Sequence, residues 1–259
     1  MRLFFPCVTV LSLGPFGCGD SSFGDGGDGE GASGQGAGSS TGPGGGGPPI
    51  DPGCDGDATA HDGEGTYYDF ADGSGNCGFP ATPNDLMVAA MNHTDYADSA
   101  ACGSCVEITG PNGTVKVRIV DRCPECPQGD IDLSPEAFER IAELSAGRVP
   151  ISWKYVACDV MGPVVYHFKD GSNPYWTAIQ MRNHTYAIAK LEAADGAGNY
   201  ASLGRVDYNY FIADGGLGDG PYKLRVTDVA GHVIEDEGIA LGDDVDRPGT
   251  KQFPVCGGN

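Results

Sequence analysis

Positive charge is scarce in this sequence. Lys and Arg number 15 against 36 Asp and Glu, which gives a formal net charge of −21. A chain of this charge repels nucleic acid phosphates and anionic lipid headgroups. We therefore expect no nucleic-acid partner, and we expect a neutral partner rather than a charged one.

Long apolar runs are also missing, because no stretch after the N-terminus reaches the ~20 residues of a transmembrane helix. Residues 1–18, "MRLFFPCVTVLSLGPFGC", combine one Arg with a short apolar run and small residues. This pattern is typical of a signal segment. Gly17 before Cys18 resembles the lipobox of bacterial lipoproteins, so acylation of Cys18 and plain secretion both stay open. We expect no other insertion into a membrane.

Large apolar side chains are almost absent from residues 19–53, which are rich in Gly and Ser. Such a segment buries too little surface to offset the entropy of ordering it. We predict a disordered linker with a reach of roughly 30 Å. The whole chain is nevertheless 40% hydrophobic, so the remaining residues have enough apolar side chains for a core.

Cysteine is plentiful, with 10 in all. Cys7 and Cys18 fall in the leader, and the remaining even number, outside the cell, suggests a disulfide framework. The spacing of Cys102-x-x-Cys105 and Cys123-x-x-Cys126 is close to that of a four-thiolate zinc site, and "CPEC" is also compatible with a redox dithiol. An oxidising compartment favours disulfides, so we predict neither a metal nor a cofactor.

Strand signals dominate the folded part. "SCVEITG" and "TVKVRIVD" flank Pro111-Asn112-Gly113, which predicts a tight hairpin, and "PISWKYVAC" repeats the apolar alternation. A helix is predicted after Ser134, with Pro135 at its first position and Gly147 at its end. A second short helix is predicted from Asn84 through "DLMVAAM".

Beyond Cys158 the strand signals continue without helical ones, at the spacing of a β-sandwich. A boundary near Met161-Gly162-Pro163 divides the folded region. We therefore predict a mainly β protein with a mixed, barrel-like domain over residues 54–160 and a β-sandwich domain over residues 161–259.

Several motifs resemble those of bacterial expansins. "GEGTYYDF", "CGSCVEITGPNGTVKVRIVDRCPEC" and "GDIDLSPEAF" resemble the six-stranded double-psi β-barrel of that family. "DGSNPYWTAIQMRNHTYAI" and "VDYNYF" resemble its immunoglobulin-like sandwich, a family 63 carbohydrate-binding module. The resemblance implies a protein that loosens cellulose-containing walls without hydrolysing them, with cellulose or a related β-glucan as its partner.

The resemblance also implies a polar groove on the barrel. Thr66 falls on the groove threonine, Asp121 on the acidic residue after a long strand, and Asp132 on the aspartate that expansins share with family 45 endoglucanases. Cys123 stands where bacterial relatives carry an aromatic residue. Tyr68 or its neighbour Tyr67 is the substitute available in this chain.

Asp132 raises the alternative of an enzyme, either an endoglucanase or a lytic transglycosylase. Inverting hydrolysis needs a protonated acid and a base ~6.5–9.5 Å away. Asp121, Asp69 and Asp72 are candidate bases, although the resemblance implies that expansins lack one. The helix dipole after Asp132 favours its charged form and burial opposes it, and a purely structural role stays open.

Aromatic residues in the second half are the candidate sugar-binding platform. Tyr175, Trp176 and Tyr208 match the family's aromatic row, with Lys169 beside it, and flat rings pack well on sugar faces. Tyr175 and Trp176 share a surface only if Pro174 keeps that segment irregular, because strand neighbours point to opposite faces. The alternative is that these rings belong to the sandwich core.

For the cysteines, the resemblance implies the pairs Cys77–Cys102, Cys105–Cys158 and Cys123–Cys126, which leaves Cys54 for Cys256. We expect a secreted monomer, with a lipid anchor at Cys18 as the open variant. The leading hypothesis is non-hydrolytic wall loosening. The alternatives are an enzyme acting through Asp132 and an adhesin that binds carbohydrate without loosening it.

Overall fold

The structure is a computed structural model that describes residues 50–51, 59–69 and 71–256. The predicted signal segment, Cys18 and most of the predicted linker lie outside the described residues. All described residues belong to one compact unit, residues 45–259. Within this part of the chain, no helix has the length and apolar character needed to cross a bilayer.

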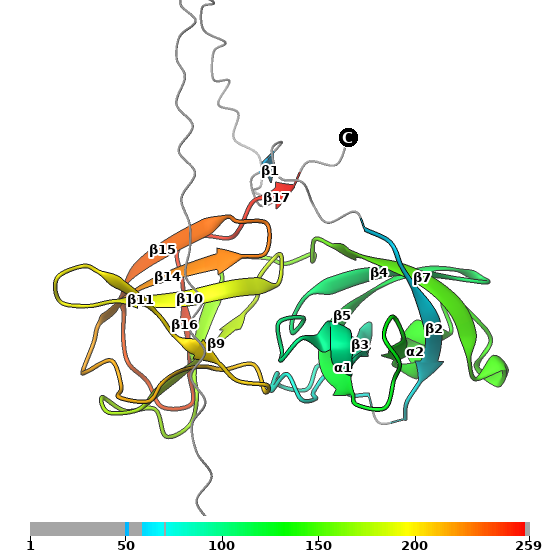
Figure 1. The fold of residues 1–259 in the computed structure, drawn as a ribbon, viewed down its shortest axis with the longest axis horizontal. Coiled ribbons are helices and arrows are strands. Elements are labelled where there is room, and N and C mark those ends of the chain that lie inside the picture. The colour runs from blue at the N-terminus through cyan, green and yellow to red at the C-terminus, as the bar shows by residue number, and fades with distance from the viewer. Residues whose placement is uncertain (1–49, 52–58, 70, 257–259) are drawn as a thin grey trace, which may run out of the picture. The chain divides into compact units, whose positions relative to one another are not determined.

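Six strands close into a barrel in the order β2-β6-β3-β5-β4-β7 (Figure 1). They are β2 (His61–Tyr67), β3 (Val88–Asn92), β4 (Cys105–Gly110), β5 (Gly113–Cys123), β6 (Ile131–Leu133) and β7 (Val149–Val156). The pairs β2–β6 and β3–β5 are parallel, and the other pairs are antiparallel. The barrel expected from the resemblance is present.

The predicted hairpin is the β4–β5 pair, in which Gly110 lies opposite Gly113. Val115, Val117 and Ile119 of β5 are buried in the barrel core, as their alternation indicated. Trp153 on β7 is buried in the same core, and its indole nitrogen donates to the carbonyl of Gly129 at 2.7 Å. The indole bond satisfies the one polar group of the largest core side chain.

The predicted helix over residues 84–91 is wrong. Val88–Asn92 form strand β3, and all five residues are buried between β5 and β6. A short apolar run is ambiguous between helix and strand, because a strand buried on both faces shows no alternation. Here pairing on both edges decided the outcome.

The predicted helix after Ser134 begins where expected but is much shorter. Helix α2 spans Pro135–Phe138, and the Ser134 hydroxyl accepts from the Ala137 amide at 3.1 Å. A separate 3-10 turn, Leu144–Ala146, ends at Gly147. The short helix α1, His93–Tyr96, follows β3.

Two further sheets form a β-sandwich, and their core includes Phe168 and Ile179 from one sheet and Leu191 and Leu224 from the other. The sheet orders are β11-β10-β14-β15 and β12-β13-β9-β8-β16. The strands are β8 (Val165–Phe168), β9 (Thr177–Arg182), β10 (Ile188–Ala194), β11 (Tyr200–Ser202), β12 (Gly204–Arg205), β13 (Phe211–Ala213), β14 (Tyr222–Asp228), β15 (Val233–Ile239) and β16 (Val245–Pro248). A short parallel pair, β1 (Ile50–Asp51) with β17 (Val255–Cys256), completes the elements. The predicted mainly β class is confirmed.

Three disulfides have both cysteines among the described residues, and they are the pairs that the resemblance implied: Cys77–Cys102, Cys105–Cys158 and Cys123–Cys126. All four cysteines of the two C-x-x-C motifs are therefore oxidised, which rules out the four-thiolate zinc alternative, because zinc binds thiolates. Cys256 is also disulfide-bonded, and its expected partner, Cys54, lies outside the described residues.

We predict that these disulfides contribute unequally to stability. Cys105–Cys158 spans 53 residues and Cys123–Cys126 spans 3. Loop-closure entropy then predicts a loss of about 4 kcal/mol for a Cys105→Ala/Cys158→Ala variant and roughly 1.6 kcal/mol for Cys123→Ala/Cys126→Ala. Urea unfolding of both variants beside the wild type measures this, and equal losses would contradict the prediction.

Candidate functional site

A row of side chains crosses four strands of the barrel. Thr66 on β2 pairs with Asp132 on β6, and Asp132 pairs with Ala90 on β3. On its other edge, Ala90 pairs with Asp121 on β5. Paired residues share one face of a sheet, so the two aspartates lie two strand spacings apart, about 10 Å, with the methyl group of Ala90 between them.

A register shift places Asp121 on this face. Ala89 pairs with Ile119 but Ala90 pairs with Asp121, so Val120 has no partner on β3 and the alternation changes phase. Val120 is fully buried, and Asp121 is only half-buried. Without the shift, Asp121 would share the buried face of Val117 and Ile119.

Thr66 and Asp132 are directly bonded. The Thr66 hydroxyl donates to one carboxylate oxygen of Asp132 at 2.5 Å. This leaves the second carboxylate oxygen of Asp132 available to accept a hydrogen bond from a ligand hydroxyl. The bond fixes the orientation of the Thr66 hydroxyl relative to the Asp132 carboxylate.

Burial raises the pKa of Asp132. Desolvation of its carboxyl is the largest cause, and the nearby Glu125 and Asp121 carboxylates act in the same direction. The hydrogen bond from Thr66 and the charge of Arg148 only partly offset the rise. Helix α2, whose dipole would favour the charged form, has only four residues.

Tyr68 lies among these carboxylates. Burial raises the pKa of its hydroxyl, and Asp121, Asp132 and Asp72 add to the rise, so the phenol stays a neutral donor. That hydroxyl finds no hydrogen-bond partner in the part of the chain that the structure describes. The ring of Tyr67 instead packs 5.0 Å from that of Phe138, toward the barrel core. Of the two tyrosines, Tyr68 is the one that faces the groove.

A tight turn presents the aromatic pair on the sandwich. The side-chain oxygen of Asn173 accepts from the amides of Tyr175 and Trp176 at 2.9 and 3.2 Å, with Pro174 between. Both aromatic residues therefore precede strand β9 rather than lie in it, which removes the strand alternation that would have separated them. Tyr175 is 80% exposed and Trp176 is half-buried.

Tyr208 lies in the turn before β13 and is 39% exposed, whereas Tyr210 is 7% exposed. The two rings are 5.9 Å apart, and the Lys169 ammonium lies 5.9 Å from the Tyr210 ring. Tyr210 is thus a supporting ring beneath Tyr208, not a second exposed member of the row. Lys169 also pairs with Asp170.

Trp176 and Tyr208 both lie next to strand β9 or its neighbour. Trp176 immediately precedes β9, and Tyr208 lies in the turn before Phe211, which pairs with Ile179 of β9.

One short segment connects the row of aspartates with the aromatic row. The Asn76 amide donates to Asp121 at 2.7 Å, and the Asn76 side chain donates to the carbonyl of Asp207, next to Tyr208, at 2.8 Å. The carbonyl of Cys77 accepts from Gln180 on β9 at 2.8 Å. In Figure 1 this cyan loop meets the gold loop of the sandwich. Hydrogen bonds through the Asn76–Cys77 segment therefore connect the aspartates of the barrel groove with the part of the sandwich that carries Tyr208.

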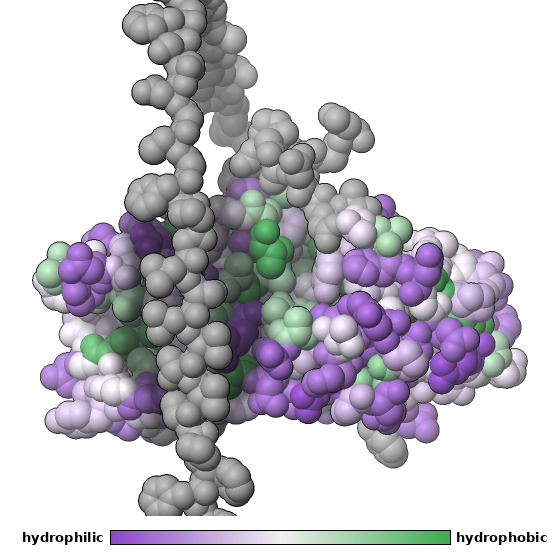
Figure 2. Space-filling view, viewed as in Figure 1, coloured by the Kyte–Doolittle hydropathy of each residue, from purple (hydrophilic) through white to green (hydrophobic). Residues whose placement is uncertain are grey.

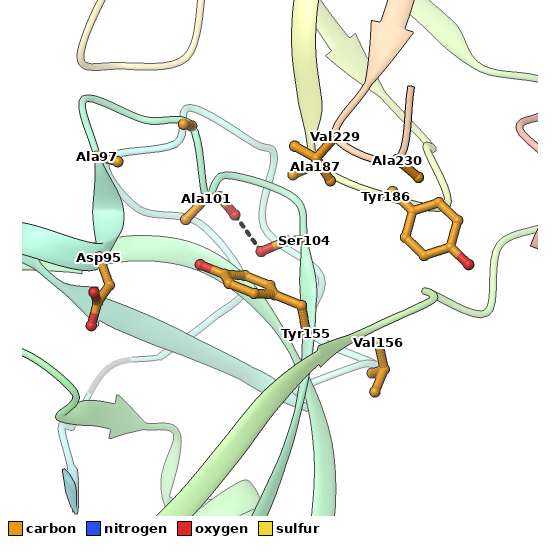
Figure 3. Close-up of a pocket in the computed structure, with 11 residues that line it drawn as sticks. Asp95, Ala97, Ala101, Ser104, Tyr155, Val156, Tyr186, Ala187, Val229 and Ala230 are labelled. Carbon is orange, nitrogen blue, oxygen red and sulfur yellow. Dashed lines mark hydrogen bonds between the residues drawn. The ribbon is translucent and has the colours of Figure 1, made fainter. Parts of the chain in front are cut away.

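The cavity drawn in Figure 3 is a different place. It has a volume of about 320 Å³ and is lined mainly by apolar groups, with Tyr155, Tyr186 and Val229 among them. It contains no residue of the groove or of the aromatic row. The face seen in Figure 2 carries mainly hydrophilic side chains with apolar ones among them.

Comparison with known proteins agrees with this architecture. A double-psi β-barrel family model described as a lytic transglycolase matches residues 62–153. Expansin-YoaJ of Bacillus subtilis is 35% identical over 180 residues, which cover 68% of this chain and 77% of that protein. The chain belongs to the expansin family. Expansin-like protein 2 of Dictyostelium discoideum is 35% identical over 181 residues, covering 66% of this chain and 44% of that protein.

Solved expansins share the fold. The crystal structure of the apo expansin of Clavibacter michiganensis matches with a TM-score of 0.71 and 33% identity, covering 76% of this chain and all of that one. An Asp-to-Asn variant of the same expansin, solved in complex with cellohexaose, matches with a TM-score of 0.71 and 32% identity, again over 76% of this chain.

Three residues near the candidate site of this expansin were not predicted from the sequence. Ala90 lies between the aspartates only because β3 pairs on both edges, Asn76 joins groove to platform across 131 residues of sequence, and Glu125 acts on Asp132 from the Cys123–Cys126 loop. Ala90 and Asn76 are common residue types in unremarkable contexts. Only Glu125 was visible as an acid near a predicted site residue.

We predict that Asp132→Asn stabilises the protein at neutral pH. The folded-state pKa of Asp132 is raised above its unfolded value, so ionisation costs stability as pH rises through the folded-state pKa. Asn removes that cost and still accepts from Thr66. Urea unfolding between pH 3 and 8 should show an advantage for the variant at pH 7 that shrinks on acidification.

The control is Asp62→Asn, an exposed carboxylate on the same strand as Thr66. An advantage of Asp132→Asn that grows toward low pH would contradict the assigned role of burial.

Proposed function

We propose that this expansin binds cellulose or a related β-glucan and loosens it without hydrolysis. Tyr175, Trp176 and Tyr208 adsorb on the sugar faces of the polymer, with Lys169 at the edge of the row. Thr66, Asp121 and Asp132, with the Tyr68 hydroxyl, exchange hydrogen bonds with glucan hydroxyls and so compete with those between glucan chains. We assign the two roles to a barrel domain over residues 54–160 and a sandwich domain over residues 161–259.

The observation that carries this proposal is the hydrogen-bonded register between groove and platform through Asn76. Because one segment bonds to both, one glucan chain can contact the aromatic residues and the aspartates together. The Clavibacter expansin in complex with cellohexaose supports an uncharged glucan as the ligand. The high negative charge of this protein disfavours anionic polymers at long range.

An enzyme is the second candidate, since a related family model is described as a lytic transglycolase and the pKa of Asp132 is raised, as a general acid requires. Against it, the backbone amides of Asn76 and Arg122 both donate to one oxygen of Asp121, at 2.7 and 2.8 Å, so only its other oxygen is left to activate water. A binding adhesin that does not loosen the wall is the third candidate.

We also propose that the protein acts outside the cell as a monomer, either secreted freely or held by a lipid at Cys18. The disulfides fit an oxidising compartment. A neutral polysaccharide is the expected partner, with no nucleic acid.

We predict that Trp176→Ala lowers adsorption on crystalline cellulose by about tenfold, since an aromatic stacking contact is worth about 1.5 kcal/mol. Depletion isotherms on crystalline cellulose measure it. Tyr200→Ala is the matched control, because Tyr200 lies on β11 in the other sheet. Equal adsorption of Trp176→Ala and wild type would contradict the assignment of Trp176 to the sugar-binding surface. Stronger adsorption of the wild type on peptidoglycan than on cellulose would contradict the proposed target.

We predict that the purified protein increases creep of cellulose strips without releasing soluble reducing ends. Asp132→Asn should reduce creep and leave cellulose adsorption intact, because Asp132 lies in the groove and not in the platform. Reducing ends or cleaved muropeptides that disappear in Asp132→Asn would establish the enzyme. Adsorption with no creep in the wild type would establish the adhesin.

A further inference from the structure

A second, smaller cavity has a positively charged lining. Its volume is about 140 Å³, and Arg118 of β5 and Arg182 of β9 both line it, with Asn183, His184 and Thr82. No Asp or Glu is among the described residues that line it. The chain has 36 acidic and 15 basic residues, so a cavity lined by two arginines and no acid is unusual for this protein.

Arg118 lacks a protein acceptor. Among residues 59–69 and 71–256, none forms a hydrogen bond or ion pair with its guanidinium, which lies 5.3 Å from the ring of Phe79. Desolvation lowers the pKa of Arg118, and Asp85, whose charge opposes this, lies beyond ion-pair distance. A half-buried cation without a countercharge is costly, and such a group calls for a bound ion or ordered water.

Arg182 is the second arginine that lines the cavity. It donates to Gln180 at 2.6 Å and to Asp246 at 3.1 Å, which uses only part of its five donors. Burial lowers the pKa of His184 to about 4, so this imidazole is neutral at ordinary pH. The uncompensated positive charge of the cavity therefore comes from Arg118, while Arg182, which is paired with Asp246, contributes its remaining donors.

The cavity lies beside the proposed glycan surface. Gly78, next to the cavity residue Phe79, leaves a Cβ position 3.5 Å from Tyr208 and 3.2 Å from Gln180. A larger side chain there would press on both. The cavity is far smaller than the pockets of ~300–1,000 Å³ that enclose drug-sized ligands, so it suits one small group.

We propose that this cavity binds a small oxyanion of the carboxylate or sulfate class through Arg118 and Arg182. Guanidinium groups bind such anions with paired, charge-assisted hydrogen bonds. The source is either a free inorganic anion or the carboxylate of an acidic sugar. This inference stands independently of cellulose binding, which uses the neutral aromatic row.

To test this, the full chain is titrated with sodium sulfate, with glucuronate and with glucose at constant ionic strength. Binding is measured by calorimetry and by the chemical shifts of backbone amides in NMR spectra. Saturable binding of one anion per protein is expected, with shifts at Gly103 and Asn183, and no binding of glucose. Tighter binding of glucuronate than of sulfate assigns the cavity to acidic sugars, and the reverse order assigns it to free anions.

Arg118→Gln should weaken anion binding at least about tenfold, because a hydrogen bond to a charged group is worth about 1.5–3 kcal/mol. Arg118→Lys should lie between this variant and the wild type. Arg140→Gln removes the same charge from an exposed site outside the cavity and should change nothing.

Absence of saturable binding to the wild type, or shifts confined to residues away from the cavity, would overturn the proposal even if Arg118→Gln fails to fold. Equal affinity of a folded Arg118→Gln variant would overturn it too. Adsorption of the same samples on cellulose is measured in parallel, so a failure of the proposed function is seen separately.

Discussion

The pairing of β3 with both β5 and β6 is the constraint on which the groove depends. It places Ala90 opposite Asp132 on one edge and opposite Asp121 on the other, and the register shift at Val120 turns Asp121 out of the core. Because β3 is buried throughout, its position is held by the hydrophobic core of the barrel. The spacing of the two carboxylates is therefore a property of the packed barrel and does not depend on flexible loops.

A second constraint ties the groove to the aromatic row. The Asn76–Cys77 segment is fixed to the barrel by the Cys77–Cys102 disulfide and to the sandwich by bonds to Asp207 and Gln180. Gly75 is required here, because a Cβ would lie 2.5 Å from Asp121. In the proposed function, adhesion and hydrogen-bond exchange would then act on one polymer, since the two surfaces are bonded to the same segment.

The distribution of charge also differs between parts of the molecule. Acidic residues outnumber basic ones by 36 to 15 in the chain, whereas the small cavity lined by Arg118 and Arg182 has no acid among its described lining residues. An overall negative protein thereby combines a surface suited to a neutral polymer with a local site suited to an anion. The first depends on shape and ring faces, and the second on desolvated guanidinium groups.

The sequence by itself determined the β class, the β4–β5 hairpin and the cap at Ser134, because each depends on local alternation or on side chains bonding to nearby backbone. The motif resemblance indicated the barrel, the disulfide pairs and the residues of the candidate site. Only the tertiary structure decided that residues 88–92 are a strand, that Tyr210 is buried beneath Tyr208, and that Asp121 faces outward although the alternation of Val117 and Ile119 would bury it. These features depend on pairing and packing between segments distant in sequence, and no local pattern contains that information.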